Sequence, residues 1–287
     1  MNSMKWQEVI FQYDGTYEGF LCCIYESYIH KEFPIAFCSD EECCSLYEVR
    51  YITTDRQHAQ RVLRSLVKIS ADVSALLRRA FLTCLEEKEV HLYAFVRKLY
   101  KDGPVFLRNR SDPVYYPIAK ALRHMSGELE KLRGFVRFSD YNGILGGEIE
   151  PKNCVLPLLR RHFCDRYANE SFFLYDRTHR EILLYTQGKS RIFPVDNLQL
   201  NTPDEQETHY RTLWKRFYDT VAIQERYNPH CQNTFLPKRY RSTMTEFLPV
   251  TDCPKSSSDE KLHAVPAEKP ALGKPVKSAM SAAVSDT

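Results

Sequence analysis

Apolar positions along the chain predict a mainly helical first half. An apolar run at 9–13 predicts a strand, and apolar residues four positions apart predict a helix over 17–30. A second strand is expected at 45–52, and from there to residue 133 the spacing is helical. The residues that define these helical faces are Ala59, Val62, Leu63 and Leu66; Val73, Leu76, Leu77, Ala80 and Phe81; Leu92, Phe95, Val96 and Leu99; and Ile118, Leu122, Met125, Leu129 and Leu132.

Short motifs mark where these helices begin and end. Thr54 with Gln57 has the spacing of a capping box, and Asp112-Pro113 is a typical helix start. Asp102-Gly103-Pro104 and Gly134 are expected to end two of the helices. These signals divide the segment into four helices.

The pattern changes at Gly134 from helical spacing to short strands. Asn142-Gly143 is a strong hairpin signal between predicted strands at 135–138 and 144–150. A helix over 153–167 follows. Further strands are expected at 172–176, 181–186 and 191–195.

The last predicted helix begins at Thr202-Pro203-Asp204-Glu205, which combines an N-cap, a proline and a glutamate of the first turn. It carries an apolar stripe of about four turns. Packing on the chain's own core is the simpler explanation of this stripe, and a docking face for another protein is the alternative. The stripe consists of Tyr210, Leu213, Trp214, Phe217, Tyr218 and Val221.

Strands and helices segregate along the chain, which indicates the α+β class. Residues 1–133 are expected to be mostly helical with one or two strands. Residues 134–248 are expected to form an antiparallel sheet with a packed helix, a C-terminal amphipathic helix and a basic segment, as a second domain or as part of the first. Residues 249–287 are rich in Pro, Ser, Ala and Lys, which predicts a disordered tail.

Composition and charge exclude several classes of protein. The chain has 287 residues and a net charge of +3 at pH 7, which by itself does not mark a nucleic-acid binder. No run approaches the roughly 18 apolar residues of a membrane span, and the N-terminus lacks a secretory signal. We expect a soluble, cytoplasmic protein with no membrane partner.

The ten cysteines are expected to be thiols, because no export signal points to an oxidising compartment. A mixed metal site of His30, Cys38, Cys43 and Cys44 is conceivable, but ordinary thiols are the better explanation and no metal site is predicted. The chain has no C-x-x-x-C-x-x-C motif, so we do not expect it to carry the iron–sulfur cluster of a radical enzyme.

The first candidate site is the predicted turn between strand 9–13 and helix 17–30. Asp14 and Glu18 lie where a helix start exposes its N–H groups, a common arrangement for a catalytic acid and base. The alternative is a well-capped helix whose acids only complement the helix dipole.

The second candidate site is a segment from Arg226 to Arg241 that holds four cations and no acid. Cations interleaved with flat rings and amides suit phosphate contact and base stacking. The alternative is an irregular segment whose arginines pair with acids elsewhere in the chain. The predicted nucleic-acid-binding residues are Arg226, Tyr227, Asn228, Gln232, Lys238, Arg239, Tyr240 and Arg241.

The third candidate site is a cleft between the two predicted hairpins. Arg137 and Glu150 lie on the arms of the first hairpin, and Asp176 and Arg177 enter the turn of the second. His162 lies on the intervening helix. Solvated turn charges and a boundary histidine are the alternative. His179 and His209 are expected to be solvated.

Familiar catalytic motifs are absent from the sequence. The chain has no phosphate-binding loop, no G-x-G-x-x-G, no G-x-S-x-G elbow and no zinc-deaminase signature. Nucleotide hydrolysis, serine hydrolysis and zinc deamination by familiar routes are therefore disfavoured.

Motifs along the chain nevertheless carry a resemblance. Over about residues 9–247 the sequence resembles a bacterial family of DNA metabolism or DNA repair proteins whose core domain has no assigned function. The motifs are F-x-Y-D-G-T-x-E-G-F-L at 11–21, G-F-V-R-F at 134–138, I-E-P at 149–151, H-F-x-x-R-Y at 162–167, L-Y-D-R at 174–177, L-W-K-R-F-Y at 213–218, E-R-x-N-P at 225–229 and P-K-R-Y at 237–240.

The resemblance implies two partners. One is DNA, and the other is a radical S-adenosylmethionine protein, which is typically encoded beside family members; some members are fused to a uracil-DNA glycosylase-like domain. S-adenosylmethionine and an iron–sulfur cluster are expected in that partner, and no cofactor is expected in this chain. Two departures stand out: Arg241 replaces the usual Trp after P-K-R-Y, and Phe replaces Trp near 172–173.

The leading expectation is a DNA-binding accessory protein of a repair or modification system. Arg226, Lys238, Arg239 and Arg241 would hold phosphates, with Tyr227 and Tyr240 as stacking platforms. An enzyme in its own right that uses Asp14 and Glu18 is the first alternative. A protein–protein adaptor that docks through the stripe at 210–221 is the second.

Overall fold

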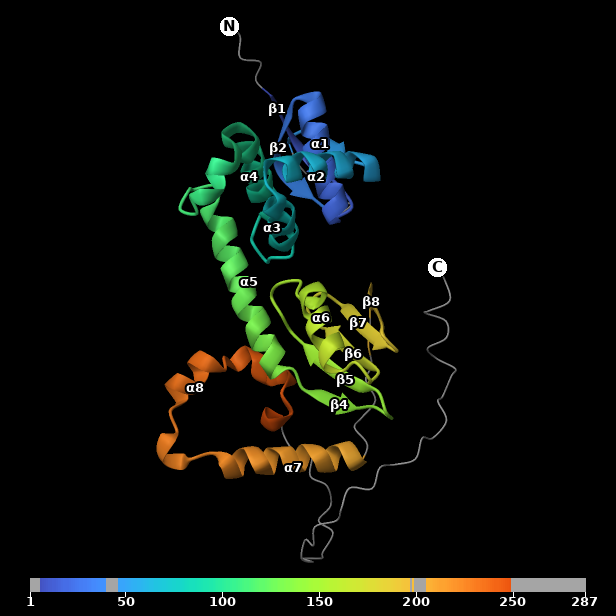
Figure 1. The fold of residues 1–287 in the computed structure, drawn as a ribbon, viewed down its shortest axis with the longest axis vertical. Helices are drawn as coiled ribbons and strands as arrows, with labels where there is room; N and C mark the ends of the chain where they lie inside the picture. Colours follow the sequence, from blue (N-terminus) through green and yellow to red (C-terminus); the bar gives the residue numbers. More distant parts are fainter. Residues whose placement is uncertain (1–5, 40–45, 197, 199–204, 249–287) are drawn as a thin grey trace, which may run out of the picture. The chain divides into compact units, whose positions relative to one another are not determined.

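The computed structural model describes residues 6–39, 46–196, 198 and 205–248. All of them belong to one compact unit of the chain, Met1–Pro249. Figure 1 shows their helices and strands, which combine two sheets with helices and confirm the α+β class.

A parallel sheet of three strands lies at the start of the chain. Its order is β2-β1-β3, with β1 (Gln7–Gln12) between β2 (Glu32–Cys38) and β3 (Val49–Tyr51), and α1 (Tyr17–His30) crosses from β1 to β2. The sequence pattern missed β2 because Pro34 argues against a strand. An edge strand tolerates the missing N–H of a proline, and β2 is an edge strand.

The predicted strand at 45–52 is shorter than expected, since β3 covers only Val49–Tyr51, and residue 45 lies outside the described residues. The four predicted helices after it are confirmed, with a short 3-10 helix before the last. They are α2 (Arg56–Ile69), α3 (Ala71–Phe81), α4 (Lys88–Asp102), η1 (Gly103–Arg108) and α5 (Tyr116–Phe135).

The predicted capping box of α2 is wrong. Asp55, not Thr54, is the N-cap, and its carboxylate accepts hydrogen bonds from the N–H groups of Gln57 (2.6 Å) and His58 (3.1 Å). The hydroxyl of Thr54 instead donates to Asp14.

The predicted ends of α5 also shift. The helix starts at Tyr116, because the Asp112 carboxylate accepts from the N–H of Val114 (3.0 Å) and closes a turn before it. The helix continues through Gly134 to Phe135, so the predicted strand at 135–138 begins only at Phe138.

The second sheet has five strands in the order β4-β5-β6-β7-β8. The β4–β5 hairpin turns at Asn142 and Gly143, whose φ angles of 56° and 86° suit a two-residue turn, as predicted. The predicted antiparallel sheet is wrong for one pair: β5 and β6 run parallel, because α6 (Leu156–Arg166) crosses between them. The strands are β4 (Phe138–Asp140), β5 (Leu145–Ile149), β6 (Phe172–Asp176), β7 (Glu181–Thr186) and β8 (Lys189–Pro194).

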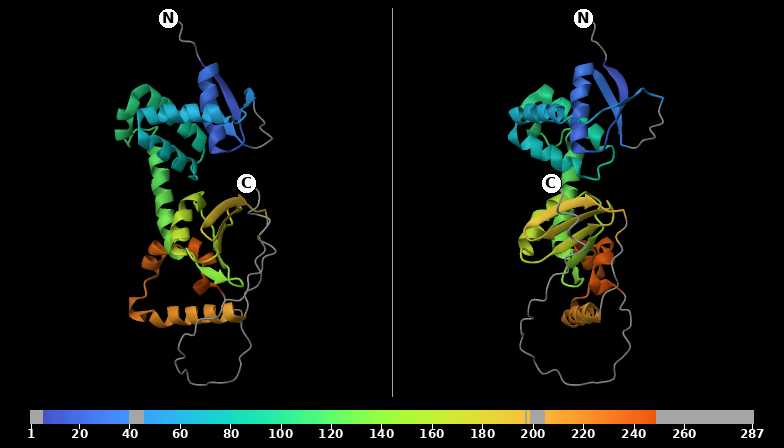
Figure 2. Two further views of the ribbon diagram at one scale, coloured as in Figure 1. Left: turned by 45° about the vertical axis from the view of Figure 1, so that its right-hand side comes forward. Right: turned by 90° about the vertical axis from the view of Figure 1, so that its right-hand side faces the viewer.

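Two hydrophobic cores hold these elements together. The first includes Phe11, Phe20 and Phe95, and the second includes Phe163 and Phe172. Helix α5 takes part in both cores. Helix α6 packs against β7 and β8, and the views of Figure 2 show this helix beside the second sheet. The second core therefore fixes the strand ends that carry the site described below.

The C-terminal part of the described chain consists of short helices after one long one. The start signal predicted at 202–204 and the tail predicted at 249–287 lie outside the described residues. No helix among the described residues is long and apolar enough to cross a membrane. The elements are α7 (Glu205–Val221), η2 (Gln224–Arg226), α8 (Pro229–Phe235), η3 (Lys238–Thr243) and η4 (Thr245–Phe247).

Candidate functional site

The carboxyl ends of β5 and β6 meet at one edge of the second sheet, because the two strands are parallel neighbours. Glu150 follows β5, and Asp176 ends β6 with Arg177 next to it. Arg177 Nη1 lies 2.9 Å from Glu150 Oε1, and the Ser242 hydroxyl donates to Glu150 Oε2 at 2.9 Å. The structure thus brings together Glu150, Asp176 and Arg177 of the predicted cleft.

Asp176 is fully buried and organises the turn between β6 and β7. Its Oδ1 accepts from the N–H groups of Thr178 and His179, both at 3.0 Å. Its Oδ2 lies 2.7 Å from His179 Nδ1. The carboxylate therefore fixes both the backbone of the turn and the orientation of the imidazole.

His179 also forms a side-chain hydrogen bond with the thiol of Cys154. The hydrogen bond to Asp176, followed by the one to Cys154, raises the pKa of His179 to about 10. A carboxylate, an imidazole and a thiol are thus connected in series; we call Cys154, His179 and Asp176 the Cys–His–Asp cluster. The prediction that His179 is solvated is wrong.

The sequence pattern missed this cluster because its members are far apart along the chain. Cys154 precedes α6, whereas Asp176 and His179 follow it. The spacing of Asp176 and His179, three residues apart at a predicted hairpin turn, was the available signal. No spacing rule connected that turn to one of ten cysteines.

The loop that carries Cys154 is held on both sides. The buried carboxylate of Glu128, on α5, accepts from the N–H groups of Lys152 (3.1 Å) and Asn153 (3.0 Å) and from the Asn153 amide (2.6 Å). The side-chain oxygen Oδ1 of Asn153 accepts from the N–H of Cys84 (2.9 Å), and the Cys154 N–H donates to the backbone carbonyl of Leu82 (2.9 Å). These bonds fix the position of the thiol.

Three of the eight predicted nucleic-acid-binding residues have structural contacts within the chain and do not form a free surface. Arg239 pairs with the buried Glu128 at 3.0 Å. Tyr240 is buried and packs edge-on against Phe135, so neither face of its ring is available to stack on a base. Arg241 donates to Asn233 (2.9 Å) and to the Leu236 carbonyl (3.1 Å). The roles predicted for these three residues are corrected accordingly.

The other residues of that segment divide into structural and exposed ones. Asn228 caps α8 by accepting from the N–H of Cys231 at 3.0 Å, and Gln232 donates to the Tyr218 hydroxyl at 3.2 Å. Arg226, Tyr227 and Lys238 are exposed.

Arg137 and His162 do not join Glu150, Asp176 and Arg177 at the carboxyl ends of β5 and β6. Arg137 forms a two-point pair with Glu246, at 2.7 Å and 3.2 Å, which ties η4 to the start of β4. His162 Nε2 is buried without a hydrogen-bond partner. Burial and then the charge of Arg133 lower the pKa of His162.

Asp14 and Glu18 do not form an acid–base pair by their contacts. Asp14 Oδ1 accepts from the N–H (2.9 Å) and hydroxyl (2.7 Å) of Thr16, and Oδ2 accepts from Thr54 (2.6 Å). Burial opposes ionisation, but these hydrogen bonds outweigh it and lower the pKa of Asp14. Glu18 lies exposed in the first turn of α1. These hydrogen bonds give Asp14 a structural role in the turn before α1.

A hollow of about 490 Å³ lies between α3, α5 and the loop before α5. Arg79, Arg110 and Arg123 line it together with one acid, Asp72; we call it the arginine pocket. Arg79 Nη2 donates to Ser126 Oγ at 3.3 Å, and all three arginines are exposed. The pattern of apolar residues gave no signal for it, because the three arginines lie on separate elements.

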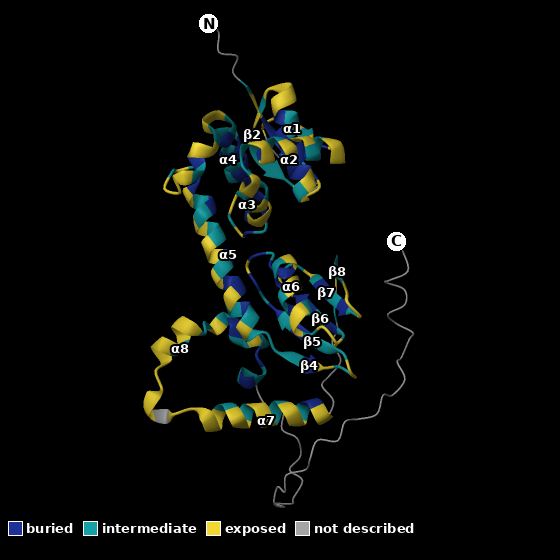
Figure 3. Ribbon diagram, in the orientation of Figure 1, coloured by how far each residue is buried: buried dark blue, intermediate teal, exposed yellow. Residues whose placement is uncertain are grey.

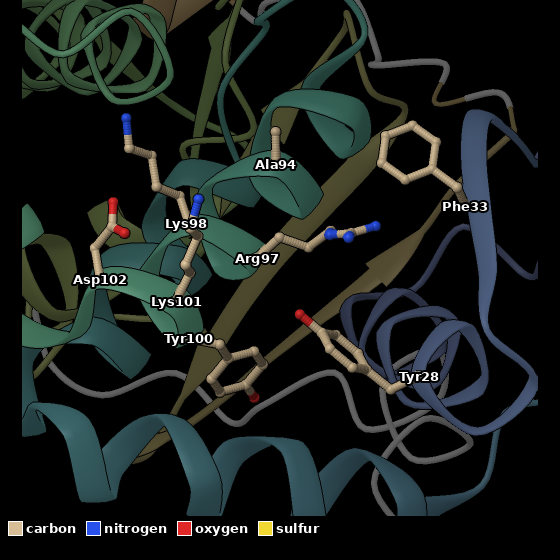
Figure 4. Close-up of a pocket in the computed structure, with 8 residues that line it drawn as sticks. All are labelled: Tyr28, Phe33, Ala94, Arg97, Lys98, Tyr100, Lys101 and Asp102. Atoms are coloured by element: carbon tan, nitrogen blue, oxygen red, sulfur yellow. The ribbon is translucent and has the colours of Figure 1, made fainter. Parts of the chain in front are cut away.

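A larger hollow of about 740 Å³ lies beside α4, and two of the three cations that line it, Arg97 and Lys98, are already engaged. Figure 4 shows Arg97 reaching between Phe33 and Tyr28, and the guanidinium carbon lies 5.0 Å from the centre of the Phe33 ring. Lys98 Nζ pairs with Asp112 at 2.5 Å. This hollow therefore offers a phosphate fewer unpaired cations than the arginine pocket does.

Among the residues that the structure describes, no group of three or more His, Cys, Asp or Glu side chains could hold a metal ion. His30 instead lies 3.1 Å from Glu26, and Cys43 and Cys44 are outside the described residues.

A family model for a domain of unknown function, DUF4130, matches residues 86–246, more than half of the chain. The chain belongs to the DUF4130 family. The Cys–His–Asp cluster and its supporting Glu128 lie inside the DUF4130 match, whereas the parallel sheet with Asp14 precedes it. No curated protein and no solved structure matches the chain.

Proposed function

We propose that this chain binds DNA and serves as an accessory protein of a DNA repair or modification system, with a radical S-adenosylmethionine protein as its partner. The observation that supports DNA contact is the arginine pocket. Three guanidinium groups face one hollow, and Asp72 is the one acid that lines it. Guanidinium groups bind phosphate through paired N–H donors, and such contacts supply most of the non-specific affinity for DNA.

The exposed residues of the predicted segment would provide further contacts with DNA. Arg226 and Lys238 are solvent-facing cations, and the Tyr227 ring is 71% exposed, so it is available to stack on a base. Arg239 and Arg241 have structural partners, so a variant that removes them would disturb the fold and could not report on DNA contact.

The experiment is a fluorescence anisotropy titration of single- and double-stranded oligonucleotides across a salt series. It compares the wild-type chain with the variant Arg79→Gln/Arg110→Gln/Arg123→Gln. Loss of three phosphate contacts should weaken binding more than ten-fold at low salt. It should also reduce the slope of log K against log salt by about 2 for single strands.

Two control variants show whether the loss of affinity is specific to the arginine pocket or follows from any loss of positive charge. Arg160→Gln/Arg161→Gln/Arg166→Gln removes the same charge from exposed positions on α6. Arg226→Gln/Lys238→Gln tests the segment predicted from sequence. If the α6 variant lowers affinity as much as the pocket variant, the arginine pocket is not the contact. If no oligonucleotide binds at low salt, DNA contact by this chain is wrong.

A protein–protein adaptor is the second candidate function, and the surface of α7 favours it. The apolar stripe does not pack on the core as the simpler expectation held: Trp214 is 40% exposed, Phe217 56% and Val221 59%. Figure 3 shows α7 as mainly exposed or intermediate along its length. In this proposal the stripe receives the radical S-adenosylmethionine protein.

Co-expression with the protein encoded by a neighbouring radical S-adenosylmethionine gene tests the adaptor function. The chain should co-purify with that protein, and Leu213→Ser/Phe217→Ser should abolish co-purification. Thr212→Ser/Thr220→Ser, on the same helix, is the control that should leave it intact. Recovery of the complex with the stripe variant would rule out this docking face.

A further inference from the structure

The Cys–His–Asp cluster has the order of groups that activates a thiol. Asp176 Oδ2 contacts His179 Nδ1 at 2.7 Å, which leaves Nε2 as the ring nitrogen that can address the Cys154 thiol. An imidazole that is oriented by a carboxylate and is hydrogen-bonded to a thiol matches the general pattern of an activated nucleophile. Nothing in the proposed DNA contact uses these three groups.

We propose that Cys154 is the nucleophile of an acyl-transfer site, with His179 as acid–base group and Asp176 as the residue that positions His179. The substrate class is an ester or amide carbonyl. Acyl transfer is favoured over displacement at an alkyl carbon because an amine or alkoxide that leaves a carbonyl carbon needs a proton, which His179 can supply.

The step balances without a cofactor. At pH 7 His179 already carries its proton, because its pKa is raised to about 10. Cys154 attacks in the thiolate form, after its proton has gone to solvent, and the sulfur electron pair forms a bond to the carbonyl carbon. The bond from that carbon to the leaving oxygen or nitrogen then breaks, and His179 gives its proton to the leaving group. Water next gives a proton to the neutral His179 and attacks the thioester, which releases the acid and restores the thiolate.

The fixed backbone supports this role over a chance contact. The loop of Cys154 is held by Glu128 through the buried Asn153, and the turn of His179 is held by Asp176. Both partners of the thiol–imidazole contact therefore sit on anchored backbone. A cysteine that serves only for packing would not need either anchor.

The test uses p-nitrophenyl acetate as the probe with the full chain at pH 7. Release of nitrophenol is followed by absorbance, and acetylated cysteines are identified by mass spectrometry of peptides. Cys84, which is exposed, is the internal reference. We expect acetyl transfer to Cys154 at least ten-fold faster than to Cys84, and Cys154→Ser should remove that fast phase.

Variants then separate activation from simple exposure. His179→Gln should slow acetylation of Cys154 at least ten-fold and leave Cys84 unchanged, and Cys84→Ser should leave the fast phase intact. Equal rates at Cys154 and Cys84 in the wild-type chain would overturn the proposal without any variant. If Cys154 is acetylated at an unchanged rate in a His179→Gln chain that circular dichroism shows to be folded, His179 only stabilises the turn and the proposal is overturned. Neither result bears on DNA binding, which is tested on other residues.

Discussion

Two aspartates occupy equivalent places in the two sheets. Asp14 follows β1, the central strand of the parallel sheet, and Asp176 ends β6, which is parallel to β5. Both lie in turns and both accept backbone N–H groups, at 2.9 Å from Thr16 and at 3.0 Å from Thr178. Their remaining partners differ: Asp14 bonds to hydroxyl groups, whereas Asp176 bonds to an imidazole.

The difference shows that the partner, and not the position of a carboxylate, decides what it can do. The Thr16 and Thr54 hydroxyls only fix the connection between two strands and hold Asp14 ionised. The imidazole of His179 is hydrogen-bonded both to Asp176 and to the thiol of Cys154. The sequence favours the first turn as a site because it has a second acid nearby; the contacts favour the second.

The largest expected effect concerns the anchoring of the loop that carries Cys154, the third member of the Cys–His–Asp cluster. Glu128→Gln removes the charge that pairs with Arg239 and holds the Cys154 loop, so it should lower the free energy of unfolding by about 3 kcal/mol. Glu130→Gln, on the same helix but with an exposed carboxylate, should cost less than about 1 kcal/mol. Urea denaturation measures both, and equal costs would show that the loop does not depend on Glu128.

A glycine beside Asp14 sharpens the structural side of the comparison. A Cβ on Gly19 would come within 2.2 Å of Asp14 Oδ1 and 2.8 Å of Thr54 Oγ1. Gly19→Ala should therefore destabilise the chain by about 2 kcal/mol. A Cβ on Gly127, in α5, meets nothing within 4 Å, so Gly127→Ala should stabilise by about 0.5–1 kcal/mol. If thermal melts show that both substitutions change the stability in the same direction, the close packing of Gly19 against Asp14 is contradicted.

The pH dependence of stability distinguishes the two aspartates by sign. The raised pKa of His179, about 10 instead of 6.5, means that its contribution is fully present below pH 6.5 and is lost as the pH rises through about 10. The lowered pKa of Asp14 has the opposite sign: its contribution is present above the ordinary range of an aspartate and is lost as the pH falls.

The stability gap between wild type and His179→Gln should therefore be about 1.5–3 kcal/mol at pH 6 and should close towards pH 10. Urea denaturation at pH 6, 8 and 10 measures it. A gap that stays constant over this range would mean that the imidazole is not held protonated by Asp176.

The sequence predicted elements with strong periodicity and missed contacts between distant segments. Helix α3 and strands β6 and β7 lie where the apolar spacing placed them, and Asn142-Gly143 forms the expected turn. The parallel pairing of β5 with β6 depends on the crossover through α6, which spacing alone does not report. Local patterns cannot anticipate such long-range pairing.

The sequence predicts only part of the candidate site, again because local patterns do not report contacts between distant segments. Glu150, Asp176 and Arg177 were placed together because they end predicted strands, and they do lie together. Cys154 and His179 were missed because one lies in a loop and the other in a turn. The sequence predicts DNA contact for Arg239 and Tyr240 because a segment of basic and aromatic residues has the same composition whether it contacts phosphate or the chain's own Glu128.

The most direct measurement of the central claim, that Asp176 serves a reactive site while Asp14 serves the fold, is competitive alkylation. Limiting iodoacetamide at pH 7 is divided between Cys154 and Cys84, and mass spectrometry gives the ratio in wild type, Asp14→Asn and Asp176→Asn chains. The account predicts a ratio above ten in wild type, the same ratio in Asp14→Asn, and a ratio near one in Asp176→Asn. A ratio near one in wild type, or an equal fall in both variants, would contradict it.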